Sequence, residues 1–306
     1  MSRIHEALVK ARQQQSGSAP EFPDVQEIIA TGVTEPEPDQ AADVASDGGP
    51  LEMLETVAGA SILTHCLQQD WQVDGSNLIF LAGETHAVAQ EQFRTLRSRL
   101  YQMRGNASLK VMVVASALPG EGKSFVSANL AHSFALQDNR RALVIDADIR
   151  RAGGLSTMLG APCTPGLTDY LLGEQRLENV IQLGSQKNLY LIPCGKRVPD
   201  PGELIGDSRF KTMIQQLRPV FDWIVIDTPP VVPIADARNI ADLADGVLMV
   251  VNTRSTLAHV AKRAIQEFRR ESLLGVLLNR TSEPSAIYYS AYGYGNGSGD
   301  IATQSK

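Results

Sequence analysis

The sequence predicts an α/β fold, a doubly wound and mostly parallel sheet with helices on both faces, preceded by a largely disordered N-terminal extension. Two observations lead to this fold. Apolar runs such as VMVV and VLMVV are uninterrupted, which is typical of strands that are covered on both faces. These runs also alternate with segments of helical character, and strands that alternate with helices imply right-handed crossovers within a parallel sheet.

The expected elements follow one another along the chain. Strands are expected at 78–82, 109–116, 142–146, 189–193, 222–227, 246–252 and 273–278. Helices are expected at 87–104, 124–137, 207–218 and 257–271. The domain organisation is a short amphipathic helix (1–15), an acidic, largely disordered linker (16–75), a folded domain (76–282) and a flexible tail (283–306).

Charge is distributed unevenly. Between Arg12 and Arg94 there is no Lys or Arg, whereas this stretch carries 14 Asp and Glu. Residues 16–50 are rich in Pro, Gly, Asp, Glu and Ser, which predicts a disordered acidic linker. This linker either screens a basic core or simply keeps the chain solvated. No run approaches 18 apolar residues, so we expect no transmembrane helix. The N-terminus lacks the apolar centre of a secretory signal.

The remaining general features are weaker. Residues 2–15 have apolar side chains at helical spacing, and the small apolar face favours docking to a partner over stable membrane insertion. Cys66, Cys163 and Cys194 match no metal-binding spacing, which indicates buried, reduced thiols in a cytosolic protein.

Residues 113–131 are predicted to form a strand, a loop and a helix, with the sequence VVASALPGEGKSFVSANLA. The loop ends in Gly120-Glu121-Gly122-Lys123-Ser124, which is the end of a phosphate-binding P-loop. Glycines let backbone N–H groups surround phosphate oxygens, the lysine reaches the β- and γ-phosphates, and the serine hydroxyl can bind Mg²⁺. Ala117 stands where the standard motif has its first glycine, so a Gly-rich turn with an incidental lysine is the alternative. The expected nucleotide contacts are Gly120, Glu121, Gly122, Lys123, Ser124 and Phe125.

Carboxylates follow two further strands. In ALVIDADIRR, residues 142–151, Asp146 and Asp148 are two residues apart and point the same way from a strand end. In FDWIVIDTPP, residues 221–230, Asp227 ends a run of apolar residues. We expect Ser124, Asp146 and Asp227 to hold Mg²⁺, and Lys123, Asp146, Asp148 and Asp227 to be catalytic.

These motifs resemble those of the bacterial tyrosine autokinases (BY-kinases) of capsular and exopolysaccharide synthesis, in the P-loop MinD/ParA-like superfamily. ALPGEGKS resembles the Walker A motif of the family, LVIDADIRR its Walker A′ and IVIDTPPVVPIADA its Walker B. The segment 193–210 resembles the loop and helix start that precede the Walker B strand. The resemblance covers about residues 85–294, and it implies that 76–282 is a kinase domain that uses ATP and Mg²⁺.

The resemblance also assigns roles to two outlying segments. EQFRTLR fits the E-x-x-R-x-x-R pattern with which these kinases form rings, so Glu91, Arg94 and Arg97 are the expected oligomer interface. An intrahelical Glu91–Arg94 pair is the alternative. The sequence IYYSAYGYGNGSG resembles the tyrosine cluster that the family phosphorylates on itself. The expected phosphorylation sites are Tyr288, Tyr289, Tyr292 and Tyr294.

The predicted function is therefore ATP-dependent tyrosine autophosphorylation that regulates polysaccharide synthesis or export. Either Asp146 or Asp148 could accept the tyrosine proton. Asn279 either contacts adenine or caps a strand end, and Asp236 is expected to be structural. Two other functions stay open, a MinD/ParA-like positioning ATPase and a catalytically silent scaffold. The first usually has a lysine early in the P-loop, where this chain has Leu118.

The resemblance implies partners as well. We expect a homo-oligomer, possibly a ring, and a separate membrane-bound polysaccharide co-polymerase that activates the kinase. Nucleic acid is not an expected partner. The expected location is the cytoplasm, at the inner face of the plasma membrane through that partner.

Overall fold

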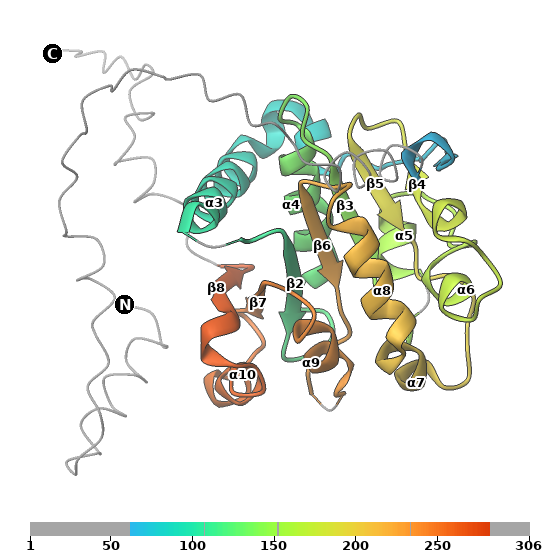
Figure 1. Ribbon diagram of the computed structural model, residues 1–306. Coiled ribbons are helices and arrows are strands. Elements are labelled where there is room, and N and C mark those ends of the chain that lie inside the picture. Colours follow the sequence, from blue (N-terminus) through green and yellow to red (C-terminus); the bar gives the residue numbers. More distant parts are fainter. Residues whose placement is uncertain (1–61, 107, 152, 233, 282–306) are drawn as a thin grey trace, which may run out of the picture. The chain divides into compact units, whose positions relative to one another are not determined.

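The computed structural model describes residues 62–281 apart from 107, 152 and 233 (Figure 1). The predicted N-terminal helix, residues 16–61 of the acidic linker and the tail tyrosines lie outside the described residues. Residues 62–75, predicted as the end of the disordered linker, instead belong to the folded domain, because Leu67–Gln68 form a strand of the sheet and Trp71 is buried in the core. All features below belong to the domain that these residues form.

An eight-stranded sheet organises the domain, in the order β1-β4-β5-β3-β6-β2-β7-β8. Neighbouring strands are parallel except β4 and β5, which are antiparallel. This confirms the predicted doubly wound, mostly parallel sheet. The strands are β1 (Leu67–Gln68), β2 (Val111–Ser116), β3 (Ala142–Asp146), β4 (Gln182–Leu183), β5 (Leu189–Ile192), β6 (Trp223–Asp227), β7 (Gly246–Asn252) and β8 (Leu273–Asn279).

Helices connect the strands and cover both faces of the sheet (Figure 1). The α-helices are α3 (Ala87–Asn106), α4 (Lys123–Ala135), α5 (Gly154–Met158), α6 (Leu167–Leu171), α7 (Pro201–Gly206), α8 (Ser208–Leu217), α9 (Asp236–Ala241) and α10 (Ala258–Ile265). Single 3₁₀ turns are η2 (Ile79–Leu81), η3 (Gly83–His86), η4 (Leu177–Val180) and η5 (Arg270–Ser272).

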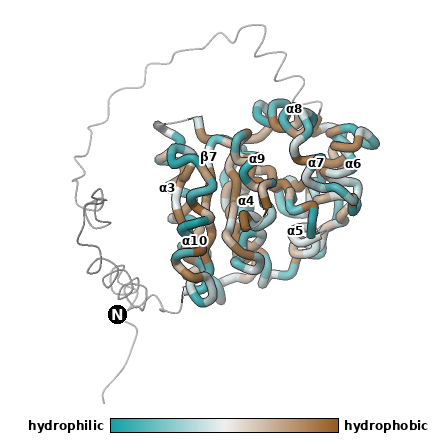
Figure 2. Tube along the Cα trace, turned by 90° about the horizontal axis from the view of Figure 1, so that it is seen from below, coloured by the Kyte–Doolittle hydropathy of each residue, from teal (hydrophilic) through white to brown (hydrophobic). Residues whose placement is uncertain are grey.

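The core has two halves, one on each face of the sheet. Along β2, Val111 and Val113 pack into the half that includes α8, α9 and α10, whereas Met112 and Val114 pack into the half that includes α3 and α4. All four side chains are fully buried. Uninterrupted apolar runs are therefore needed, because each face of a central strand lies under helices. Hydrophobic residues accordingly run through the interior of the domain, and outer helices such as α10 carry both hydrophobic and hydrophilic residues (Figure 2).

Two predicted elements are wrong. The strand expected at 78–82 is the 3₁₀ turn η2, because the side chain of Asn129 on α4 accepts the backbone N–H of Ile79 at 2.9 Å and holds the segment against that helix. The helix expected at 257–271 ends at Ile265, and the turn η5 follows it. Short elements such as β1, β4 and α5 were not predicted, since two to five residues are too few to show a period.

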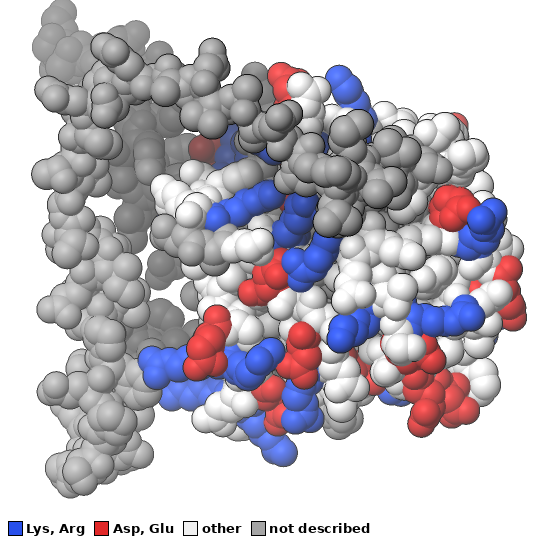
Figure 3. Space-filling model, in the orientation of Figure 1, with Lys and Arg blue, Asp and Glu red and all other residues white. Residues whose placement is uncertain are grey.

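Over α10, Lys and Arg side chains lie among Asp and Glu (Figure 3). Arg238 pairs with Glu267, and Arg269 pairs with Asp242. Within the described part of the chain, every helix is too short or too polar to span a bilayer.

Candidate active site

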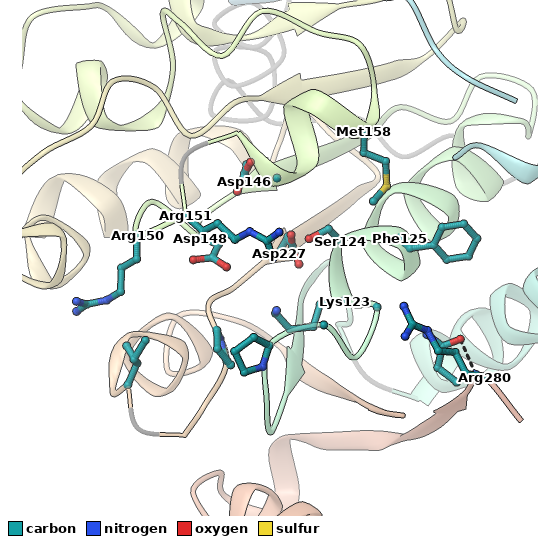
Figure 4. A pocket seen from close by; sticks show the side chains of 17 residues that line it. Lys123, Ser124, Phe125, Asp146, Asp148, Arg150, Arg151, Met158, Asp227 and Arg280 are labelled. Carbon is teal, nitrogen blue, oxygen red and sulfur yellow. Dashed lines mark hydrogen bonds between the residues drawn. The ribbon is translucent and has the colours of Figure 1, made fainter. Parts of the chain in front are cut away.

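A pocket with a volume of about 650 Å³ opens at the carboxyl ends of β2, β3 and β6 (Figure 4). Ligand sites of open α/β sheets lie at this edge. The P-loop, both aspartates of the DAD sequence and Asp227 all contribute to its walls, so the structure brings together the three motifs that the sequence singled out. The volume falls within the range of small-molecule sites.

Backbone geometry at the P-loop depends on glycine. Gly120 and Gly122 have φ values of +79° and +101°, which favour glycine. A Cβ atom at Gly122 would lie 2.2 Å from Nδ2 of Asn279, so this position also needs glycine for space. Ala117, the departure from the standard motif, is fully buried in the core, where its methyl group is accommodated. Helix α4 begins at Lys123 and directs its N-terminus toward the phosphate site.

The Glu121 side chain braces the loop and does not line the pocket. Its carboxylate is buried and accepts the backbone N–H groups of Leu118, at 2.6 Å, and of Asn252, at 3.2 Å. It also accepts the hydroxyl of Thr256. The prediction that Glu121 contacts the nucleotide can therefore apply only to its backbone, since its side chain is used to fix the loop to β7.

Asp146 and Asp227 are paired in the register of the neighbouring strands β3 and β6, so they lie side by side. Each is about 1% exposed. Burial and the mutual repulsion of these carboxylates raise the pKa of Asp146 well above its usual value. Burial raises the pKa of Asp227 to about 6, although Lys123 and the Ser124 hydroxyl act in the opposite direction. Two buried carboxylates side by side are unfavourable unless a cation lies between them.

The hydrogen bonds of this pair are incomplete. Leu155 N–H donates to Asp146 at 3.3 Å, and the Ser127 hydroxyl donates to Asp227 at 3.3 Å. One oxygen of each carboxylate, Oδ1 of Asp146 and Oδ2 of Asp227, is buried with no hydrogen-bond partner in the described structure. Oxygen ligands of this kind suit Mg²⁺, and the Ser124 hydroxyl lies beside Asp227. These residues therefore fit a magnesium ion.

The described residues contain no group of three or more His, Cys, Asp or Glu with the geometry of a metal site. A magnesium ion does not require such a group, since it can take one or two protein carboxylates, a hydroxyl and oxygens from phosphate and water. The prediction that Ser124, Asp146 and Asp227 hold Mg²⁺ stays a prediction.

Asp148 lies farther out than Asp146, half-buried on the pocket wall, with its carboxylate turned into the cavity (Figure 4). Burial raises its pKa, and the ammonium of Lys123 lowers it in part. Lys123 itself is buried and shares this pocket. An accessible carboxylate and a buried lysine thus face the same space.

Several lining residues were not predicted from the sequence. Arg150 and Arg151 belong to the LVIDADIRR motif, so their position in the chain could have identified them. Arg150 makes a bidentate ion pair with Asp236 on α9, at 2.7 and 3.1 Å, which agrees with a structural role for Asp236. Met158 on α5 and Arg280 after β8 also line the pocket, but no sequence motif indicated them.

The position of Asn279 is compatible with both of its predicted roles, a contact with adenine and a cap of the strand end. It ends β8 and lines the pocket, and its Nδ2 donates to the backbone oxygen of Glu121 at 2.8 Å. Its Oδ1 accepts the N–H of Arg280 at 2.9 Å. Asn279 therefore anchors the P-loop to the last strand. Phe125 also lines the pocket, beside Met158 (Figure 4).

The predicted interface residues on α3 lie outside this pocket and differ from one another. Arg94 pairs with Glu91 on the same helix at 3.1 Å, and both side chains are exposed. Arg97 donates to the backbone oxygen of Ser133 on α4 and is half-buried. Within one chain Arg97 therefore ties α3 to α4, whereas Glu91 and Arg94 stay at the surface.

Comparison with known proteins finds a matching family model and similar chains. The model of a family described as an AAA domain matches residues 109–270. Tyrosine-protein kinase YwqD of Bacillus subtilis is 32% identical over 212 residues, which are 69% of this chain and 89% of YwqD. The succinoglycan biosynthesis transport protein ExoP of Rhizobium meliloti is 33% identical over 66% of this chain, but this match is only 26% of ExoP.

A solved structure shows the same fold. The kinase domain of the Escherichia coli tyrosine kinase ETK superposes with a TM-score of 0.63 and 28% identity. The match covers 68% of this chain and 82% of that domain.

Proposed function

This chain belongs to the family of bacterial tyrosine-protein kinases of capsule and exopolysaccharide synthesis, and from that premise we propose that its main substrate is the tyrosine cluster of its own tail. The kinase binds a nucleotide in the pocket described above. We assign the residue roles, and the magnesium ion, as part of this proposal.

The observation that supports ATP-dependent transfer in this pocket is the pair of buried carboxylates, Asp146 and Asp227, beside Lys123 and Ser124. A magnesium ion held by Ser124, Asp146 and Asp227 would neutralise charge on the phosphates of ATP. Lys123, at the start of α4, stabilises negative charge on the transferred phosphoryl group. Backbone N–H groups of the loop 120–124 hold the phosphates in line with the acceptor.

Asp148 is the residue that we assign as the proton acceptor. It is more exposed than Asp146, and its carboxylate reaches the open part of the pocket. A tyrosine hydroxyl entering from solvent meets Asp148 first, so Asp148 can take the phenolic proton while the oxygen attacks the γ-phosphorus. The bond from that phosphorus to the bridging oxygen of ADP breaks in the same step.

The distribution of tyrosines supports the tail as the acceptor. Four of the seven tyrosines are Tyr288, Tyr289, Tyr292 and Tyr294. The other three, Tyr101, Tyr170 and Tyr190, are packed in the fold, where burial raises the pKa of the last two. A hydroxyl that is held in the core cannot enter a pocket that lies elsewhere, whereas the tail follows directly on Asn279 and Arg280 in the pocket wall.

The test is phosphate transfer between two differently marked proteins. Inactive Lys123→Met protein with an intact tail is mixed with active protein that lacks residues 286–306, ATP and Mg²⁺, and the tail is mapped by mass spectrometry. We expect phosphate on the tail tyrosines of the inactive protein, because seven extended residues from Thr281 to Tyr288 cover only about 25 Å and in-line attack within one chain is awkward. Absence of label at every concentration would contradict transfer between subunits.

The acidic residues allow a second, separable test. Asp148→Asn should lower transfer strongly but keep nucleotide binding, since the amide cannot accept the proton. Asp227→Asn should weaken magnesium-dependent binding as well. Asp242→Asn, an exposed carboxylate outside the pocket, is the matched control and should have no effect. Full activity of Asp148→Asn would overturn its assignment as the proton acceptor.

We also infer a membrane-bound polysaccharide co-polymerase as activating partner. The support is that ExoP, whose name describes a transport protein for polysaccharide synthesis, contains a region similar to this chain. The test of this partner is co-purification from membranes. We expect the chain to co-purify with such a protein from membranes, and we expect this association to be absent from soluble fractions prepared without detergent.

A further inference from the structure

A second cavity, of about 510 Å³, lies between α3 and the last strand, β8. We call it the α3–β8 groove. Its apolar floor includes Leu96 and Leu100 of α3 and Leu277 of β8, and Gln92, Arg99 and Met103 of α3 form part of its wall. An apolar floor beside polar and cationic groups suits aromatic side chains that end in a hydroxyl, because the ring is buried while the oxygen stays hydrated.

Among the described residues, the β8 side of the groove is an open sheet edge. Strand β8 ends the strand order, and β7 is its neighbour in the sheet. Its sequence LLGVLLN has no charged residue and no proline, and Val276 and Leu278 are 44% and 59% exposed. The opposite edge is the two-residue strand β1, which offers little to pair with. Long apolar edges are usually covered, because they otherwise template pairing with another strand.

Gly275 leaves open space beside the middle of β8. A Cβ atom placed there would meet no atom within 4 Å, so the strand has open space beside its centre. An aromatic side chain on an adjacent strand commonly covers a glycine of this kind. The strand that would pair here should therefore carry aromatic residues.

The chain itself supplies such a strand. The tail leaves the described structure after Thr281, and Asn279 and Arg280 line both the active-site pocket and the α3–β8 groove. After Ser282–Ala286, which contains Pro284, comes IYYSAYGY, rich in residues that favour strands. In an extended strand Tyr288, Tyr292 and Tyr294 share one face.

We propose that the unphosphorylated tail folds back on its own chain and pairs, through residues 287–294, with the free edge of β8, placing Tyr288, Tyr292 and Tyr294 over the α3–β8 groove. A connection of five residues gives a high effective concentration, so even weak contacts keep the tail docked. Main-chain hydrogen bonds supply the pairing, and the groove selects the aromatic side chains.

Docking in the groove and phosphate transfer exclude each other. A tyrosine over the groove cannot reach the nucleotide of a neighbouring subunit. Each added phosphate carries about −1.5 to −2 charges, which the apolar floor cannot solvate, so phosphorylation prevents the tail from returning. The release of the tail by phosphorylation rests on the proposed autophosphorylation, whereas the docking of the unphosphorylated tail does not.

Hydrogen exchange on the full chain tests the docking without kinase activity. The parent is Lys123→Met, whose tail stays unmodified, and the measured quantity is the exchange rate of the amides in 287–294 and in β8. We expect exchange of the tail amides at least about tenfold slower than in a free peptide of the same sequence. Addition of Leu278→Lys should abolish this protection, because the substitution puts a charge on the edge.

Leu257→Lys is the matched control. Leu257 is 62% exposed at the start of α10 and does not line the groove, so the same substitution there should leave tail exchange unchanged. Tail amides that exchange at the free-peptide rate in the parent would overturn the proposal. Protection that disappears on dilution would also overturn it, since the occupant would then be a second copy of the chain. Tail protection in Lys123→Met, together with no transfer activity in the wild-type chain, would contradict only the proposed autophosphorylation.

Discussion

The active-site pocket and the α3–β8 groove share Asn279 and Arg280 but are built in opposite ways. The pocket is lined by buried charge that the protein leaves unsatisfied, as at Asp146 and Asp227. The groove is lined by apolar surface that the protein leaves exposed, as at Val276 and Leu278. The two ligands that we propose follow from this contrast, a cation with phosphates for the pocket and an aromatic strand for the groove.

Replacing Lys123, the buried lysine of the pocket, should have the largest effect on activity. We expect Lys123→Met to lower autophosphorylation by at least about 10²–10³-fold, because the lysine stabilises charge that develops on the transferred group. The groove should be unaffected, and tail exchange should remain slow. The measurement is incorporation of phosphate from ATP by the purified protein.

Lys211→Met is the control for this substitution, since Lys211 is exposed on α8 and distant from the motif. Circular dichroism and thermal unfolding check that both variants fold. A Lys123→Met protein that labels its tyrosines at the wild-type rate would remove the basis for the pocket's assignment.

The sequence predicted the pocket better than the groove for a physical reason. The pocket depends on local patterns, the glycines of the P-loop and aspartates at strand ends, and parallel strands necessarily bring these ends to one edge. The strands 142–146 and 246–252 were predicted with the bounds that β3 and β7 have in the structure. Uninterrupted apolar sequences define such strands clearly.

The groove and the bracing contacts depend on pairs of residues far apart in the chain. Nothing in the sequence near Glu121 shows that its carboxylate bonds to Asn252 and Thr256, more than 130 residues later. The segment 78–82 was predicted as a strand from its apolar residues, but Asn129 holds it as a 3₁₀ turn. That β8 lies at an open edge follows from the strand order and not from its own composition.

Acid should destabilise the domain, because α4, the helix to which Arg97 ties α3, carries a buried histidine. Burial lowers the pKa of His132 on α4 to about 4, and its ring contacts Phe80 edge-on at 5.6 Å. The unfolded chain binds this proton near pH 6.5, so the contribution to stability is complete above pH 6.5 and is lost as pH falls toward 4. The free energy of unfolding should decrease by up to about 3 kcal/mol over this range.

Urea unfolding at pH 7 and at pH 4.5 measures this decrease, with His132→Leu as the variant that cannot titrate. The variant should lose less stability than the wild type between the two pH values. An equal loss in both proteins would mean that other groups, such as paired carboxylates, account for the acid sensitivity.

Glu121 allows the brace of the P-loop to be separated from the nucleotide contacts. Glu121→Ala removes a buried acceptor from three donors, and we expect a loss of about 2 kcal/mol in stability with weaker ATP binding. Glu203→Ala, which alters a glutamate on α7 outside the pocket, is the control. If Glu121→Ala weakened ATP binding and left the unfolding transition unchanged, its side chain would act on the nucleotide and not on the loop.

The smallest effects on the fold concern α3, and they distinguish the two arginines of the E-x-x-R-x-x-R pattern. Arg97→Ala should cost about 1 kcal/mol of stability, because Arg97 bonds to a backbone oxygen of α4. Arg94→Ala breaks an exposed pair with Glu91 and a cation–π contact with the Phe80 ring at 5.8 Å, and should change stability by only about 0.5 kcal/mol. If Glu91 and Arg94 pair between subunits in a ring, Arg94→Ala should still abolish the oligomer in sedimentation velocity and reduce transfer to the tail of a neighbour. An Arg94→Ala protein with unchanged mass and unchanged transfer would show that the exposed pair belongs to the single chain, and that the ring, if one forms, uses another surface.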